Sequence, residues 1–299
     1  KRLLAPNPSP FTFQGTGTYL IGNKEIAIID PGPRIESHVE NLLSIIDKDI
    51  LIHIFITHTH ADHSPAAELI KKERKAITYG YGAYPFEKYD TNFEEGHDLN
   101  FKPDIILKDG EVIKKKDWTI RAIHTPGHTS NHMCFGLEEN SILFTGDHIM
   151  GWSTTVIIPP DGDMTDYIKS LEKVLLFNYK TFFPTHGAPI EEPKRFVRAL
   201  IGHRKMREKQ ILNELKKNPL YIEEMVRKFY KSTDKRLWPA AEKSLLASLL
   251  SLKKKGMLSN ESNKMKEQPI IYDRFSCANC ADKGSLDFDF TMAFQPIIN

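Results

Sequence analysis

The sequence has few cysteines and no long apolar run. Three of its 299 residues are cysteine, too few for a disulfide framework, which favours a reducing compartment. No apolar run approaches the roughly 18 residues that cross a bilayer, so no membrane association is expected. The sequence starts at Lys1 rather than at methionine, which is compatible with the removal of a targeting segment. The expected location is the cytoplasm or the mitochondrial matrix.

Two common catalytic signatures are also missing. The sequence contains neither the G-x-S-x-G pattern of serine hydrolases nor the G-x-x-x-x-G-K-[ST] loop that holds nucleotide phosphates. With 40% hydrophobic and 27% charged residues, the composition is that of a globular protein with a substantial core.

The charge is distributed unevenly along the chain. Residues 195–258 contain 17 Lys and Arg against 6 Asp and Glu, an excess of +11, although the whole chain carries only +2. Such a split favours two domains with different surfaces, of which the basic one can meet a polyanion. Solvated basic helix faces explain the same excess equally well.

The first 200 residues alternate short strands with amphipathic helices, which predicts a mixed α/β (α+β) domain. Turn residues bound the expected strands, at 25–30, 51–57, 118–124, 132–137, 141–145 and 181–184. Apolar residues three and four positions apart predict helices at 35–46, 65–72, 166–177 and 193–215.

The chain then changes to helices only. Residues 201–258 predict a small winged-helix-like domain with helices at 210–215, 222–229 and 240–252 and a terminal hairpin. Residues 259–299 lose periodicity and are expected to form a poorly ordered tail. Cys277 and Cys280 form a C-x-x-C pair there, but no second pair completes a four-ligand zinc site.

One loop concentrates metal-ligand residue types. His58, His60, Asp62 and His63 occur within six positions, directly after the apolar strand 52–56. Side chains at the end of a strand converge on a crevice rather than pack in the core. Imidazole and carboxylate without cysteine suit zinc and its first-row neighbours in an open, catalytic site.

Three later loops repeat this layout. A strand, a Gly or Pro turn and then a single ligand-type residue recur at His128, Asp147 and His186. One short loop cannot surround two metals, so these residues are expected to complete the site. Two divalent cations lower the pKa of a shared water towards neutrality and polarise a carbonyl or phosphoryl oxygen, which predicts hydrolysis by a metal-bridging hydroxide.

The seven residues together resemble the metallo-β-lactamase superfamily, over roughly residues 8–190. The resemblance implies a four-layer αββα sandwich of two facing sheets. The stretches 7–12 and 15–20 and the basic helical C-terminus are similar to the β-lactamase-like protein 2 group, whose animal members are endoribonucleases. Carried over residue by residue, the family pattern implies that one metal is held by His58, His60 and His128. It implies that the other is held by Asp62, His63 and His186, with Asp147 as a bridge between them.

The remaining candidates surround this set. The resemblance implies that Asp30 orients the metal loop, although an Asp before Pro-Gly also forms plain turns. His132 is a candidate for substrate contact, and His148 for support of Asp147. Asp62 and Asp147 are the candidates for steering a proton, besides their role as ligands. The other histidines are expected to be packed within strands, or to lie at the surface in the case of His38, His97 and His203.

Three functions are compatible with these residues. The leading interpretation is a hydrolase with two zinc ions, or manganese or iron, that cleaves phosphodiester bonds in single-stranded RNA. It rests on the metal loop and on the +11 region, whose aromatic residues can stack on bases. The alternative is a thioester or lactone hydrolase of glyoxalase II type, with pocket loops at 152–163 and 80–96. A nucleic-acid-binding protein that keeps the metal site as a scaffold is the non-enzyme alternative, and a homodimer is compatible with each.

Overall fold

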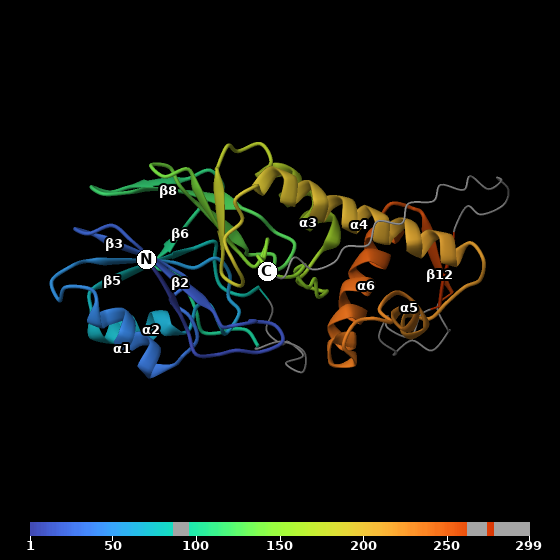
Figure 1. Cartoon of the computed structure of the whole chain (residues 1–299), viewed down its shortest axis with the longest axis horizontal. Coiled ribbons are helices and arrows are strands. Elements are labelled where there is room, and N and C mark those ends of the chain that lie inside the picture. The colour runs from blue at the N-terminus through green and yellow to red at the C-terminus, as the bar shows by residue number, and fades with distance from the viewer. Residues whose placement is uncertain (86–95, 262–273, 278–299) are drawn as a thin grey trace.

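The computed structural model describes residues 1–85, 96–261 and 274–277 (Figure 1). Its first sheet has six strands in the order β1-β2-β3-β4-β5-β6. Strands β3 to β6 are parallel to one another, and β1 and β2 add antiparallel pairs at one edge. Their bounds are β1 (Arg2–Leu4), β2 (Gly17–Ile21), β3 (Ile26–Ile29), β4 (Ile52–Phe55), β5 (Ala76–Gly80) and β6 (Ile105–Ile106).

The second sheet has five strands in the order β11-β10-β9-β8-β7. Strand β10 is parallel to β11, while β9 is antiparallel to both β8 and β10. Strands β8, β10 and β11 therefore end at the same edge. Their bounds are β7 (Val112–Lys114), β8 (Thr119–His124), β9 (Met133–Leu137), β10 (Ile142–Gly146) and β11 (Thr181–Pro184).

Helices cover the outer faces of both sheets, which gives four layers (Figure 1). Apolar side chains of α1 (Glu36–Ser44) and α2 (Ala66–Glu73) pack against the first sheet. Side chains of α3 (Met164–Val174) and α4 (Pro193–Leu215) pack against the second. Aromatic residues, among them Phe55, Trp118 and Phe135, fill the space between the sheets. The αββα arrangement expected from the sequence is confirmed.

A small helical unit follows the sandwich. The end of α4 packs with α5 (Ile222–Phe229) and α6 (Trp238–Lys254) around their own apolar core. Strand β12 (Leu258–Glu261) then pairs antiparallel with β13 (Arg274–Cys277). Three helices and a hairpin confirm the expected winged-helix architecture. None of the described helices is long and apolar enough to span a membrane.

The helix expected at 193–215 is confirmed as α4, which runs unbroken over 23 residues. The separate helix expected at 210–215 is the end of this same helix. The predicted domain boundary at residue 200 lies inside this helix, so α4 belongs to both cores. Within the predicted tail, Cys277 ends β13, and Cys280 lies outside the described residues. The division into residues 1–200, 201–258 and 259–299 stays a prediction.

Two glycines give a matched test of this packing. Gly127 has a φ of +142°, and a Cβ there would lie 2.3 Å from Cα of Tyr167 in α3. We expect Gly127→Ala to lower the free energy of unfolding by about 2–4 kcal/mol. Apart from its chain neighbours and the helix's own backbone, no described atom lies within 4 Å of a Cβ added at Gly202 in α4. Gly202→Ala should therefore raise the free energy of unfolding by about 0.5–1 kcal/mol. Urea unfolding followed by circular dichroism measures both, and equal midpoints for the two variants would contradict the expectation.

Candidate metal centre

The histidine-rich loop follows β4 and is almost entirely buried. His58, His60, Asp62 and His63 have relative exposures between 0% and 6%. Polar side chains this deep need partners or a ligand, because unpaired burial of charge is unfavourable. The loop therefore has the burial expected of a binding site rather than of a surface turn.

The other three candidates come from the second sheet. His128, Asp147 and His186 lie in the loops after β8, β10 and β11, which end at one edge. All three are buried, with exposures of 6%, 8% and 1%. The facing sheets thus bring together seven side chains separated by up to 128 positions in the sequence.

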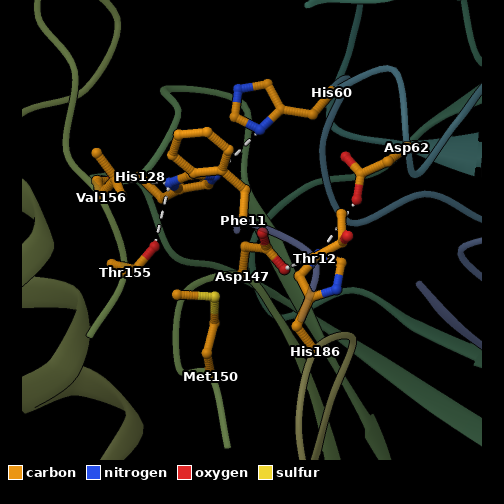
Figure 2. A pocket seen from close by; sticks show the side chains of 10 residues that line it. All are labelled: Phe11, Thr12, His60, Asp62, His128, Asp147, Met150, Thr155, Val156 and His186. Atoms are coloured by element: carbon orange, nitrogen blue, oxygen red, sulfur yellow. Dashed lines mark hydrogen bonds and ion pairs between the residues drawn. The ribbon is translucent and has the colours of Figure 1, made fainter. Parts of the chain in front are cut away.

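The donor atoms form overlapping groups. Within each group they lie no more than 4.8 Å apart: His58, His60 and His128; Asp62, His63 and His186; and His58, His63 and Asp147. The third group joins the first two, so Asp147 lies between them. Figure 2 shows His60 and His128 on one side of the pocket, Asp62 and His186 on the other, and Asp147 between them.

Distances are short in both halves. Nδ1 of His60 lies 2.8 Å from Nε2 of His58 and 3.1 Å from Nε2 of His128. In the other half, Oδ2 of Asp62 lies 3.3 Å from Nε2 of His63 and 3.1 Å from Nε2 of His186. We call these the three-histidine half and the carboxylate half.

The outward nitrogens of three rings are fixed by oxygen atoms. Nδ1 of His63 bonds Oδ2 of Asp30 at 2.9 Å. Nδ1 of His128 bonds the carbonyl of Val156 at 2.8 Å, and Nδ1 of His186 bonds the carbonyl of Gly15 at 3.2 Å. Each bond turns Nε2 towards the centre, as in metal sites where an outer acceptor fixes the histidine tautomer. The donor set and its orientation therefore fit a pair of first-row divalent cations.

Asp30 holds the two ligand-bearing sheets together. Its carboxylate accepts hydrogen bonds from the Thr57 amide and hydroxyl, both at 2.8 Å, and from the Thr185 hydroxyl at 3.0 Å. Thr57 precedes the His58 loop and Thr185 precedes His186. Asp30 itself has a φ of 48°, an uncommon value for a residue other than glycine. These contacts fit the role that the family resemblance implies for Asp30, which is to orient the metal loop.

His132 and His148 lie behind the site rather than in its pocket. His132 is fully buried, and its Nε2 accepts from the amide of Asp147 at 3.3 Å while Nδ1 contacts the Thr125 hydroxyl. His132 is thus placed to support Asp147 and not to touch substrate. His148 is also buried and packs against the ring of Tyr167.

Two histidines expected at the surface are elsewhere. His38 is 2% exposed and contacts the hydroxyl of Thr18, so the prediction that His38 lies at the surface is wrong. His97 is half-buried and stacks on Tyr84, with its ring 4.5 Å from that of His60. Neither histidine belongs to a motif shared with the metal loop, so the sequence alone gives no indication that these two side chains are buried or half-buried.

The pocket wall was predicted only in part. Besides five of the candidate ligands, the pocket is lined by Phe11, Thr12, Met150, Thr155 and Val156 (Figure 2). The expected pocket loop at 152–163 contributes two of them. The other expected loop, at 80–96, is described only for residues 80–85 and 96, so that prediction lies largely outside the described residues. Apolar wall residues have no characteristic spacing, so only the folded chain reveals them.

The two halves differ in their electrostatics. Burial and the rings of His63, His60 and His128 hold the pKa of His58 well below its ordinary value. In the carboxylate half, burial lowers the pKa of His186, but Asp147 and Asp62 outweigh burial and raise the pKa to about 10. The pKa of His63 is raised in the same way, by Asp62, Asp147 and Asp30.

These pKa shifts predict a pH-dependent difference in metal affinity. A cation binds the unprotonated imidazole, so it must displace protons from the carboxylate half at pH 7 but not from His58. We expect affinity in the carboxylate half to rise from pH 6 to pH 8, with affinity in the three-histidine half changing less. Calorimetric zinc titration of the metal-free protein, in buffers of different ionisation enthalpy, measures the protons released. Equal release for both equivalents would contradict the expectation.

Two family models match the sequence. The model of the metallo-beta-lactamase superfamily matches residues 12–186, and the model of the beta-lactamase associated winged helix domain matches residues 222–264. The matched regions contain the seven candidate ligands and the α5–α6 unit.

Curated relatives cover most of the chain. The Beta-lactamase-like protein 2 homolog of Drosophila melanogaster is 34% identical over 86% of this chain and 88% of that protein. The homolog of Caenorhabditis elegans is 34% identical over 73% of this chain and 71% of its own length. The Atrochrysone carboxyl ACP thioesterase of Claviceps purpurea is 32% identical, over 77% and 71% respectively.

Two solved structures share the fold. A metallo-beta-lactamase family protein from Thermus thermophilus aligns with a TM-score of 0.72, covering 92% of this chain and 98% of that one. A beta-lactamase domain protein from Burkholderia ambifaria aligns with a TM-score of 0.75, covering 93% and 90%. Both are 18% identical to this chain, so they support the architecture alone. The family models and the curated relatives show that the chain belongs to the metallo-β-lactamase superfamily and is similar to the β-lactamase-like protein 2 homologs.

Proposed function

We propose that the chain is a hydrolase that uses two divalent cations, most simply zinc, to cleave phosphodiester bonds in single-stranded RNA. The observation that carries the hydrolase part is the convergence of seven buried donor side chains in two adjoining halves of one pocket. Such a site, open to a pocket, differs from a closed structural metal site.

The residues have separable roles in this proposal. His58, His60 and His128 would hold one cation, and Asp62, His63 and His186 would hold the other, while Asp147, whose donor atom is grouped with those of His58 and His63, would serve both. Manganese or iron fits the same donors, because imidazole and carboxylate bind each of these metals. When bound, the cations supply an activated water and an electrophile for the oxygen under attack.

The carboxylates act as acceptors. The pKa of Asp147 and of Asp62 would rise on burial, but the His63 and His186 rings lower both values well below the ordinary range. Both groups are therefore ionised at neutral pH. Oδ2 of Asp62 already accepts from the Thr16 hydroxyl at 2.9 Å. Oδ1 of Asp147 lies 3.4 Å from Nε2 of His186 and 3.5 Å from Nε2 of His63, so the ionised carboxylate faces the donors of the carboxylate half, where it would orient an attacking water.

The RNA part rests on the basic helical unit. Exposed basic side chains along α4 and in the helical unit include Arg195, Lys205, Arg227 and Arg236, each paired with an acidic residue and between 62% and 83% exposed. Exposed ion pairs are weak, so a phosphate backbone can replace these acidic partners. The aromatic residues offer less surface for stacking on bases than expected, because the guanidinium of Arg207 already stacks on Phe229 and Tyr230 within the unit.

An RNA assay tests the proposal. We expect the zinc-loaded chain to cleave a labelled single-stranded RNA, and His58→Ala to lower the rate at least about 10³-fold because an essential donor is lost. His203→Asn, on α4 outside the pocket, is the matched control and should retain the rate. Cleavage should weaken as salt rises. If the chain binds two zinc ions but leaves the RNA intact, the proposal that single-stranded RNA is the substrate is refuted.

A thioester is the second candidate, and a different observation favours it. The ten residues that line the pocket include Phe11, Met150 and Val156 but neither Lys nor Arg. An apolar wall suits an acyl chain better than a polyanion, and one curated relative is named a thioesterase. The same fold accepts different substrates, so the pocket surface decides.

Acyl thioesters of increasing chain length distinguish this candidate. If it holds, kcat/KM rises with chain length, and Met150→Ser lowers it by about tenfold for long chains because apolar contact is lost. Thr12→Ser, which keeps the polar side of the pocket, is the control. A rate independent of chain length would count against the thioester. A chain that binds well under one zinc would instead favour the scaffold alternative.

A further inference from the structure

A short segment connects His128 to the helical unit. Val156 accepts the Nδ1 proton of His128 at 2.8 Å, and the hydroxyl of Thr155 lies 3.2 Å from the same nitrogen. The orientation of the His128 ring therefore depends on where residues 155–157 are held. Thr155 and Ile157 are buried, and Val156 lines the pocket.

Helices α4 and α6 hold this segment on both sides of Val156. Nη2 of Arg204, on α4, donates to the carbonyl of Thr155 at 2.6 Å. The amide of Ile157 donates to Oγ of Ser244, on α6, at 3.1 Å. Both side chains are buried, so neither bond competes with bulk water.

Other contacts keep these two helices in place. The guanidinium of Arg204 lies 5.3 Å from the ring centroid of Tyr167 in α3. The Ser251 hydroxyl of α6 contacts the Thr165 hydroxyl at 2.9 Å, and Lys254 forms an ion pair with Asp163. A buried guanidinium is unfavourable unless it is paired, so the Thr155 carbonyl and the Tyr167 ring hold Arg204 in this position.

We propose that Arg204 and Ser244 are positioning residues of the metal centre. They fix the Val156 carbonyl, which fixes Nε2 of His128, so the helical unit determines metal affinity in the three-histidine half. The inference rests on the metal centre of the proposed function but not on its substrate.

The carboxylate half has a different support. Arg2, on β1, donates to the carbonyls of Gly187 at 2.9 Å and Thr185 at 3.2 Å, on either side of His186. Loss of Arg204 or Ser244 should therefore weaken one metal equivalent and leave the other unchanged. A general loss of stability would weaken both.

A serine pair on α6 provides the test. Ser244→Ala removes the acceptor of the Ile157 amide, whereas Ser248→Ala removes a buried hydroxyl that donates only to the Ser244 carbonyl of its own helix. Zinc affinity of the full chain is measured for each equivalent by competition with a chromophoric chelator, and cobalt absorption reports the coordination geometry. We expect Ser244→Ala to weaken one equivalent by about tenfold, as for other outer partners of histidine ligands, and to shift the cobalt spectrum. Ser248→Ala should match the wild type.

Arg204 keeps the test decisive if Ser244→Ala does not fold. Arg204→Met should weaken the same equivalent, and Arg204→Lys should restore part of the affinity because it keeps a cationic donor. Arg2→Met should weaken the other equivalent instead. Equal affinities in Ser244→Ala and Ser248→Ala, or equal weakening of both equivalents, would overturn the inference. A wild type that binds two zinc ions but cleaves no RNA would refute the proposed substrate while leaving this inference standing.

Discussion

The buried carboxylate of Asp30 is the interaction on which the site depends. It accepts from Thr57, which follows β4 of the first sheet, and from Thr185, which follows β11 of the second, and it also bonds Nδ1 of His63. Apolar side chains fill most of the space between the two sheets, and they specify contact but not a precise angle. Arg2 and Tyr19 add hydrogen bonds from the first sheet to backbone carbonyls at the end of β11. A charged acceptor with several fixed donors supplies that precision, because each bond is directional and any unmade bond is costly in a dry interior.

Much of the site followed from the sequence because it is local. His58, His60, Asp62 and His63 lie on one short loop after an apolar strand, where spacing alone fixes proximity. His128 and His186 also follow strands, so the rule that ligands gather at strand ends located them. The six expected strands correspond to β3, β4 and β8 to β11. Strands β1, β6 and β7, of two or three residues each, were not predicted, and neither were the five-residue strands β2 and β5.

What the sequence did not reveal depends on contacts between distant segments. The bond from Arg204 to Thr155 joins residues 49 positions apart, and the bond from Ser244 to Ile157 spans 87. In sequence, Arg204 is one of many basic residues on an amphipathic helix, and a solvated position was its natural interpretation. The same limit applies to Phe11 and Met150, whose place in the pocket wall is set by loops with no periodic pattern.

The unbroken course of α4 has an evolutionary consequence. Because one helix contributes Val197 to the sandwich core and Ile211 to the helical core, the two units share a structural element instead of a flexible linker. Recombination that exchanged the helical unit for an unrelated one would also remove part of the sandwich's outer layer. The two units are therefore expected to be inherited together.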